Sequence, residues 1–169
     1  TEIYTLSLHD ALPISMLFVD GGGGTDAQLN LALEEHILRH RMGEDDLLLF
    51  YVNAPAIIIG RNQNTIEEIA EDTVRARGIQ VVRRVSGGGA VYHDLGNLNF
   101  SFMTRDVGGR FNRYDTFNRP VVEVLRSLGV PAELGGRNDI LAGGRKISGN
   151  AQFAAGDRML SHGTLLLHS

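Results

Sequence analysis

The chain has 169 residues, 43% of them hydrophobic and 21% charged, and its formal net charge is −4. This length suits a single domain with a substantial core, and the composition is that of a globular protein rather than of a disordered chain. The negative charge argues against non-specific nucleic-acid binding, which needs a basic face. No cysteine is present, so disulfides, thiolate metal sites and a cysteine nucleophile are excluded from these residues.

Membrane insertion and export are not expected either. No apolar run approaches the roughly 18 residues of a membrane span. Residues 1–20 lack the basic start and the small-residue cleavage site of a signal peptide. We therefore expect a soluble, cytoplasmic protein whose partners are neither nucleic acids nor membranes.

The first half of the chain is expected to alternate short strands with helices. Capping boxes, Thr25 with Gln28 and Thr65 with Glu68, open the two helices. The expected elements are a strand at 16–19, a helix at 26–41, a hairpin of 47–52 and 56–59, a helix from Thr65 to just before Gly78, and a strand at 79–85.

The second half is expected to be richer in strands. Residues 98–103 alternate apolar and polar side chains, and residues 114–128 carry an apolar helical stripe that ends at Gly129. Short strands separated by glycine turns follow at 140–142, 146–153 and 159–167. The predicted fold class is α+β, a mixed and largely antiparallel sheet with helices packed against it.

A glycine-rich segment, RRVSGGGAVYHDLGN at residues 83–97, carries the clearest functional signal. Gly87, Gly88 and Gly89 lack a β-carbon, so the backbone there can reach positive φ and approach a ligand closely. Successive N–H groups in such a turn form a donor site for an anion, and the guanidinium of Arg84 suits carboxylate or phosphate. The alternative is a plain hairpin turn, and His93 and Asp94 are expected to shape the loop rather than to do chemistry.

Lys146 is the only lysine of the chain, and the other 15 of its 16 basic residues are arginine. Arginine can replace lysine in a solvated ion pair, but not where a compact ammonium must sit between ligand oxygens. Lys146 is therefore a candidate ligand-binding residue. The alternative is that one surface lysine has survived by chance.

Four blocks stand in the order of a known family: NLALEE at 30–35, the run at 83–97, GRND at 136–139, and RKISG at 145–149 followed by HGT at 162–164. In these blocks the chain resembles the lipoate–protein ligase A family of the biotin/lipoate protein ligase superfamily, over residues 26–167. Four ordered blocks are far more specific than one glycine motif. The resemblance implies the fold shared by biotin and lipoate ligases and the core of class II aminoacyl-tRNA synthetases.

The resemblance also implies an activity. Such enzymes use ATP, with Mg²⁺, to convert lipoate to lipoyl-AMP, and then transfer the lipoyl group to a lysine of a carrier domain. The implied carriers are lipoyl domains of 2-oxoacid dehydrogenase E2 subunits or the glycine cleavage H protein. By resemblance, Lys146 is the catalytic residue, bridging the lipoate carboxylate and the α-phosphate.

The other implied site residues fall into three groups. Those expected at ATP or the adenylate are Arg84, Gly89, Ala90, Val91, Tyr92 and Lys146. Those expected at lipoate are Arg84, Ser86, Lys146 and His162. Asp139 is a candidate Mg²⁺ ligand, because Mg²⁺ takes carboxylate oxygen. Two alternatives stay open: Asp139 as a turn residue before a strand, and His162 on the polar face of an edge strand.

Domain boundaries follow from the same resemblance. Residues 1–15 match nothing in the family and precede Met16, so we expect a non-native extension there. Residues 16–169 then form a partial lipoate ligase catalytic domain, truncated at its C-terminus, and an accessory C-terminal domain or subunit is a further candidate partner. Such a truncation is expected to expose a sheet edge and to favour aggregation.

Two other functions remain open at this point. The first is an ATP-independent octanoyl or lipoyl transferase of the same superfamily, which uses a cysteine nucleophile that this chain lacks. The second is a non-catalytic fragment that binds lipoate or the adenylate without completing the reaction.

Overall fold

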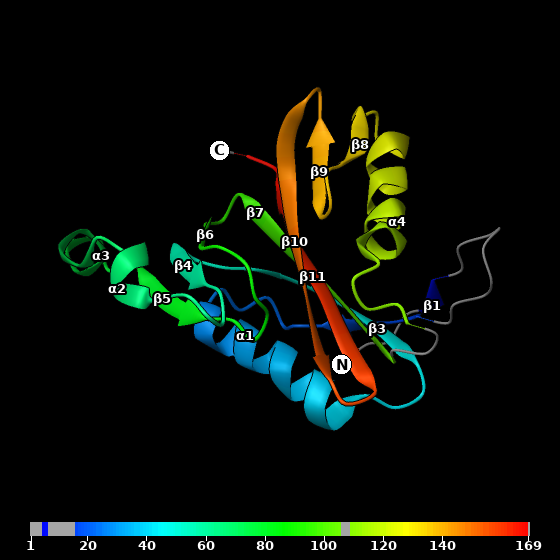
Figure 1. Cartoon of the computed structure of the whole chain (residues 1–169), viewed down its shortest axis with the longest axis horizontal. Coiled ribbons are helices and arrows are strands. Elements are labelled where there is room, and N and C mark those ends of the chain that lie inside the picture. The colour runs from blue at the N-terminus through cyan, green and yellow to red at the C-terminus, as the bar shows by residue number, and fades with distance from the viewer. Residues whose placement is uncertain (1–4, 7–15, 106–108, 169) are drawn as a thin grey trace.

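The computed structural model describes residues 5–6, 16–105 and 109–168, so most of the expected extension at 1–15 lies outside the described residues. Its main feature is a sheet with the strand order β1-β2-β3-β7-β11-β10-β9-β8 (Figure 1). These strands are β1 (Thr5–Leu6), β2 (Met16–Asp20), β3 (Asp46–Val52), β7 (Asn97–Arg105), β8 (Ala132–Gly135), β9 (Asp139–Ala142), β10 (Arg145–Ala155) and β11 (Arg158–Leu166). The pairing of β2 with β3 is parallel and the other described pairings of this sheet are antiparallel, which confirms the predicted fold class.

Strand β11 lies between β7 and β10, in the interior of the sheet. The alternative that placed His162 on an edge strand is therefore wrong. The described edges of this sheet are β1 and β8.

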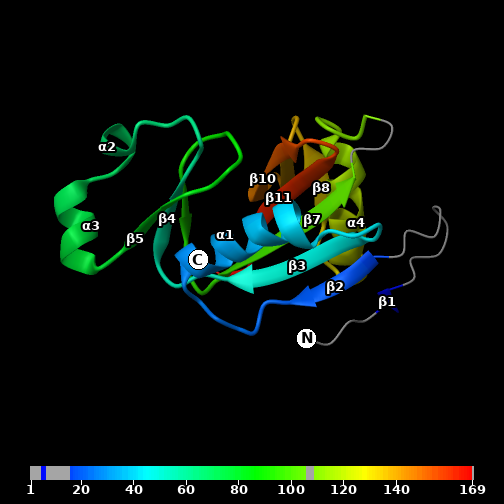
Figure 2. The ribbon, with the colours of Figure 1, turned by 90° about the horizontal axis from the view of Figure 1, so that it is seen from below.

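A second, three-stranded sheet carries the glycine-rich segment. It consists of β5 (Gln80–Arg83), β4 (Ala56–Ile59) and β6 (Val91–His93), with β4 in the middle. The glycine-rich segment connects β5 to β6. In both views this sheet lies with helices α2 and α3 at the end of the molecule away from α4 (Figures 1 and 2).

The predicted hairpin of residues 47–52 and 56–59 is wrong, because β3 and β4 belong to different sheets. Two apolar runs fix neither their partners nor their sheet. The connection instead changes sheets at Asn53, whose side chain is fully buried and binds Asn30 and His93. The N–H of Ala54 donates to the carbonyl of Thr25, which fixes the turn further.

The helix predicted at 26–41 is present as α1 (Ala27–His36), which continues as a π-helix, η1 (Ile37–Arg41). Its N-cap is Asp26, whose Oδ1 accepts from the N–H groups of Gln28 at 2.8 Å and Leu29 at 3.1 Å. The prediction of a capping box at Thr25 is therefore wrong, because an aspartate one residue later satisfies the free N–H groups of the first turn. These hydrogen bonds, the one from Leu29 above all, lower the pKa of Asp26.

The helix predicted from Thr65 is split into α2 (Thr65–Glu68) and α3 (Glu71–Arg77), since Ile69 has extended backbone angles. Asn64 caps α2, so Thr65 is not the cap. The hydroxyl oxygen of Thr65 accepts instead from Arg83 at 2.7 Å. Gly78 ends α3 in the left-handed region with φ of 60°, as its position predicted.

The main sheet is covered on both faces (Figure 2). On one face, Phe117, Val122 and Leu125 of α4 (Tyr114–Ser127) pack on side chains such as Phe100 and Phe102. On the other face, Ile37 and Leu38 of η1 pack on alternate residues of the same strands, including Leu47, Leu49 and Met103. This period-two division of β3 and β7 is what a sheet buried on both sides requires.

Candidate active site

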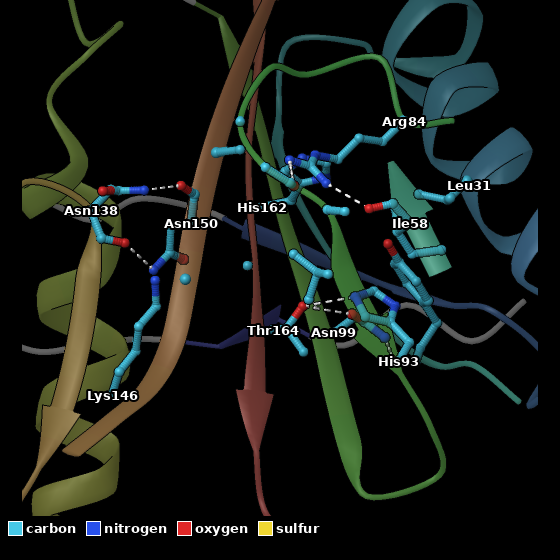
Figure 3. A pocket seen from close by; sticks show the side chains of 18 residues that line it. Leu31, Ile58, Arg84, His93, Asn99, Asn138, Lys146, Asn150, His162 and Thr164 are labelled. Carbon is cyan, nitrogen blue, oxygen red and sulfur yellow. Dashed lines mark hydrogen bonds between the residues drawn. The ribbon is translucent and has the colours of Figure 1, made fainter. Parts of the chain in front are cut away.

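A cavity of about 220 Å³ opens between strands β10 and β11 of the main sheet and the glycine-rich segment of the small sheet (Figure 3). Its lining includes six of the residues predicted for the site: Arg84, Gly89, Ala90, Val91, Lys146 and His162. Three predicted residues lie beside it. Tyr92 is half exposed and lies between Val91 and His93, which both line the cavity. Ser86 contacts His162 through a hydrogen bond. Asp139 forms an ion pair with Lys146.

The guanidinium of Arg84 organises the glycine-rich segment. It is 8% exposed, and its Nη2 donates to the carbonyls of Gly87 at 2.7 Å and Gly89 at 2.8 Å. Nη1 donates to the carbonyl of Ile58 at 3.1 Å. Burial lowers the pKa of Arg84, but these acceptors compensate for the lost solvation.

This arrangement turns two backbone N–H groups of the loop away from Arg84. The C=O and N–H groups of a trans peptide point in opposite directions. Carbonyls of Gly87 and Gly89 that face Arg84 therefore turn the N–H groups of Gly88 and Ala90 away from it. Gly88 and Ala90 both line the cavity, so the loop has the form of a backbone anion site.

Of the three consecutive glycines, only Gly88 has a positive φ, of 98°. The expectation of left-handed backbone at this segment is thus confirmed at one position. A β-carbon on Gly88 would lie 2.8 Å from Nη2 of Arg84, whereas β-carbons on Gly87 and Gly89 would meet no heavy atom within 4 Å.

Arg83 has a different task from its neighbour. Its Nη1 donates to the carbonyls of Gly60 and Gln63, both at 2.8 Å. Its Nη2 donates to Thr65. Arg83 therefore fastens the loop between β4 and α2 and points away from the cavity.

Lys146 reaches the cavity from β10, where the pairing with β9 shifts register between Lys146 and Ser148. Such an irregularity redirects a side chain. Nζ of Lys146 lies 2.9 Å from Oδ1 of Asp139, and the two side chains are 58% and 29% exposed. Gly149 leaves room for the lysine stem, since a β-carbon there would lie 3.2 Å from Cε.

His162 is held by Glu34, a residue to which the sequence assigned no role. Nδ1 of His162 donates to both carboxylate oxygens of Glu34 at 3.0 Å, and Nε2 lies 2.6 Å from Oγ of Ser86. Ser101 and Tyr51 also donate to Glu34. Burial raises the pKa of Glu34, but His162 and the two hydroxyls outweigh it, so the pKa is lowered overall.

A sequence signal for Glu34 did exist. Ala27, Leu31, Glu34 and Leu38 are spaced by four, three and four residues, so Glu34 occupies the buried stripe of α1 and η1. A carboxylate in an apolar stripe needs a buried partner, and His162 is that partner.

His93 lines the cavity beside this network. Its Nδ1 lies 2.9 Å from Nδ2 of Asn53, and its Nε2 lies 3.2 Å from Oγ1 of Thr164. The hydroxyl of Thr164 donates to Oδ1 of Asn99 at 3.0 Å. Burial and then the charge of Arg84 lower the pKa of His93 to about 4, so this imidazole is neutral at pH 7.

Asp94, predicted to shape the loop, does so through its Oδ1, which accepts from the N–H of Gly96 at 2.8 Å. In the part of the chain that the structure describes, no three potential metal ligands cluster. No helix within residues 16–105 or 109–168 is long and apolar enough to cross a membrane.

Comparison with known proteins assigns the chain to a family. Residues 26–169 match the family model of the lipoyl protein ligase A/B catalytic domain. The chain belongs to this family. The resemblance noted in the four sequence blocks is therefore confirmed.

Relatives of known structure or name support the assignment. Lipoate-protein ligase LplJ of Bacillus subtilis (strain 168) is 60% identical over 154 residues, which are 91% of this chain and 46% of that protein. A bi-partite lipoate protein ligase from Thermoplasma acidophilum, solved with its E2 lipoyl domain, is 36% identical with a TM-score of 0.81, covering 91% of this chain and 61% of that one. A lipoate-protein ligase A bound with ATP is 36% identical with a TM-score of 0.76, covering 91% and 66%. The chain thus spans about half the length of LplJ.

Proposed function

We propose that this chain forms the substrate-activating part of an ATP-dependent lipoate–protein ligase. In that reaction a carboxylate oxygen of lipoate attacks the α-phosphorus of ATP, pyrophosphate leaves, and lipoyl-AMP forms. A lysine amine of a lipoyl domain then attacks the acyl carbon, and AMP leaves. The observation that carries the proposal is the position of the sole lysine, Lys146, in the same cavity as the glycine-rich segment.

The chemistry of the cavity suits the first step. Two negatively charged reactants must approach each other, so positioned positive charge and backbone donors lower the barrier most. We assign Lys146 to the lipoate carboxylate and the α-phosphate, which requires it to leave Asp139. Breaking this half-exposed ion pair costs little free energy, because such pairs contribute only about 0–1 kcal/mol to stability.

The remaining site residues are assigned by their place around the cavity. The segment of Gly89, Ala90, Val91 and Tyr92 faces the nucleotide. His162 borders the lipoate side, with Ser86 behind it. Arg84 acts on both ligands through the loop that it organises, and this is a more indirect role than the sequence predicts for it.

Mg²⁺ is part of the proposal as a companion of ATP. This ion is commonly held by one or two carboxylates together with substrate phosphates. The donor set fits that pattern, because the carboxylate of Asp139 becomes available when Lys146 turns to the substrates. Mg²⁺ bound there would neutralise phosphate charge.

The acceptor and the location are proposed from the relatives. A ligase that is 36% identical was solved with its E2 lipoyl domain, which supports E2 lipoyl domains, or the glycine cleavage H protein, as acceptors. That ligase is bi-partite, which supports an accessory domain or subunit here. We propose that the protein acts in the cytoplasm.

Lipoate-dependent exchange of labelled pyrophosphate into ATP tests the proposal. The chain, and the same chain extended at its C-terminus, are compared with their Lys146→Gln variants. Loss of one well-placed charge is expected to lower exchange by about 10²–10³-fold. Arg145→Gln is the matched control, because Arg145 is the exposed neighbour of Lys146 on the same strand and is expected to leave exchange unchanged.

The outcomes separate the functions that remained open. Exchange in either chain that depends on Lys146 supports adenylation. Ligand binding without exchange in both chains would assign a binding role only. If neither chain exchanges but either transfers octanoyl groups from an acyl carrier without ATP, the ligase proposal is wrong.

A further inference from the structure

Four side chains form a continuous hydrogen-bonded chain from the glycine-rich segment to helix α1: Arg84, Ser86, His162 and Glu34. We infer that Glu34 is a positioning residue, which fixes the tautomer of His162 and through Ser86 holds Arg84 and its loop in the ligand-binding form. This inference deepens the proposed function. The expected effect of Glu34 on lipoate binding rests on that function. Glu34 is 1% exposed and is not part of the lining of the cavity described above.

The direction of each hydrogen bond follows from the chemistry of its partners. Nε of Arg84 can only donate, so Oγ of Ser86 accepts it, at 3.1 Å. An ionised carboxylate can only accept, so Nδ1 of His162 carries the proton that faces Glu34. In the neutral imidazole Nε2 is then the acceptor, so the hydroxyl of Ser86 donates its proton to it. All donors point the same way, from the cation at the loop to the anion on α1.

The surroundings of Glu34 keep it ionised and fixed. Besides His162, its Oε1 accepts from the hydroxyls of Ser101 and Tyr51. A buried carboxylate is tolerated only when it is paired and hydrogen-bonded in this manner. Among the described residues Glu34 is the one carboxylate that is buried. Its position under the cavity therefore places a negative charge where His162 needs an acceptor.

The same geometry resembles a serine–histidine–acid triad, but the structure argues against a nucleophilic serine. Ser86 is 1% exposed, and its oxygen already accepts from Arg84. An attacking oxygen needs open access to an acyl carbon, and Ser86 has none. The four hydrogen-bonded side chains therefore hold one another in position, and Ser86 does not carry an acyl group.

A second histidine of the cavity, His93, is expected to be the opposite tautomer and serves as an internal reference. Asn30 donates through Nδ2 to the carbonyls of Gly24 and Val52, and also to Oδ1 of Asn53 at 2.9 Å. Nδ2 of Asn53 must then donate to Nδ1 of His93, which leaves the proton of His93 on Nε2. Two histidines that line one cavity are thus expected to be opposite tautomers.

Long-range ¹H–¹⁵N NMR of the imidazole rings tests the inference on the whole chain at pH 7. In the wild type, His162 is expected to carry its proton on Nδ1 and His93 on Nε2. Glu34→Gln is expected to shift His162 toward the Nε2 tautomer and to leave His93 unchanged. Ser101→Ala is the matched control: it removes a buried donor to the same carboxylate but keeps the charge, so His162 is expected to remain protonated on Nδ1.

A kinetic readout links the tautomer to the ligand. Loss of a charge-assisted buried hydrogen bond is expected to raise the KM for lipoate in pyrophosphate exchange by roughly ten- to a hundredfold. Ser86→Ala removes the hydrogen bonds that join His162 to Arg84, so it is expected to raise the KM for lipoate as well, while His162 stays protonated on Nδ1. The kcat is expected to change less than KM in both variants.

Three results would overturn the inference. They are a wild-type His162 protonated on Nε2, a Glu34→Gln variant with unchanged His162 and unchanged KM, and a Ser101→Ala variant that alters His162 as much as Glu34→Gln does. The wild-type spectrum decides the tautomer even if Glu34→Gln does not fold. Failure of the proposed function is distinguishable, because it would abolish exchange in the wild type without changing the NMR result.

Discussion

Alanine substitution of the three consecutive glycines tests how the glycine-rich segment is built. Gly88→Ala places a β-carbon at φ of 98° and 2.8 Å from Nη2 of Arg84. Gly87→Ala and Gly89→Ala have neither problem, because their φ values are ordinary and no heavy atom lies within 4 Å. The three substitutions are chemically identical, so any difference among them reports on local geometry.

The size of the effect can be worked from these contacts. A non-glycine residue with left-handed backbone costs about 1–2 kcal/mol, and weakening one hydrogen bond of the buried guanidinium costs about 1–2 kcal/mol more. The free energy of unfolding of Gly88→Ala is therefore expected to fall by roughly 2–4 kcal/mol, which lowers Tm by roughly 4–16 °C for a chain of this size.

Urea denaturation and thermal unfolding measure this difference. Gly87→Ala is the matched control, since Gly87 is not part of the cavity lining, and it is expected to unfold like the wild type. Gly89→Ala is expected to match the wild type in stability too. Equal destabilisation by all three substitutions would show that Arg84 does not organise the loop as described.

Two further predictions concern pH and the space around the loop. Because the pKa of His93 is about 4 against 6.5 for a free histidine, the unfolded chain binds a proton first as pH falls. Stability contributed by neutral His93 is thus fully present above pH 6.5 and declines toward pH 4, by about 3 kcal/mol in total. In urea denaturation measured at a series of pH values, His93→Gln should reduce the loss of stability between pH 6.5 and pH 4. An unaltered pH dependence would contradict the assignment. A β-carbon at Gly60 would overlap the carbonyl oxygen of Gly88, so Gly60→Ala should displace the loop and weaken ATP and lipoate binding in calorimetry by about tenfold or more. Gly43→Ala, which meets no heavy atom within 4 Å, serves as the control, and equal affinities would refute the displacement.

The sequence predicted the positions of most helices and strands but not their partners. Residues 47–52 and 56–59 are strands, as their apolar character indicates, yet they belong to two sheets. Pairing depends on the buried contacts of Asn53 with Asn30 and His93, and these join residues far apart in the sequence. Short strands such as β6 and β8 were not predicted, because three or four residues carry too little periodicity.

The candidate site was predictable where residue type alone carries the signal. Lys146, Arg84 and His162 line one cavity, as the ordered blocks indicated. The sequence could not show that the guanidinium of Arg84 faces the loop carbonyls, because that depends on where the backbone turns. Glu34 was overlooked because a glutamate in a helix usually faces solvent, and its stripe position gains meaning only with His162 opposite it.

The single ε-amine of this chain also makes it a selective target for chemical labelling. Lys146 is 58% exposed, and the other basic side chains of the chain are arginine or histidine. An amine-directed acylating reagent should therefore attach to one side chain, besides the α-amino group. Since that side chain lies in the cavity, the rate of labelling reports directly on whether a ligand covers it, without any need to engineer a reporter group into the protein.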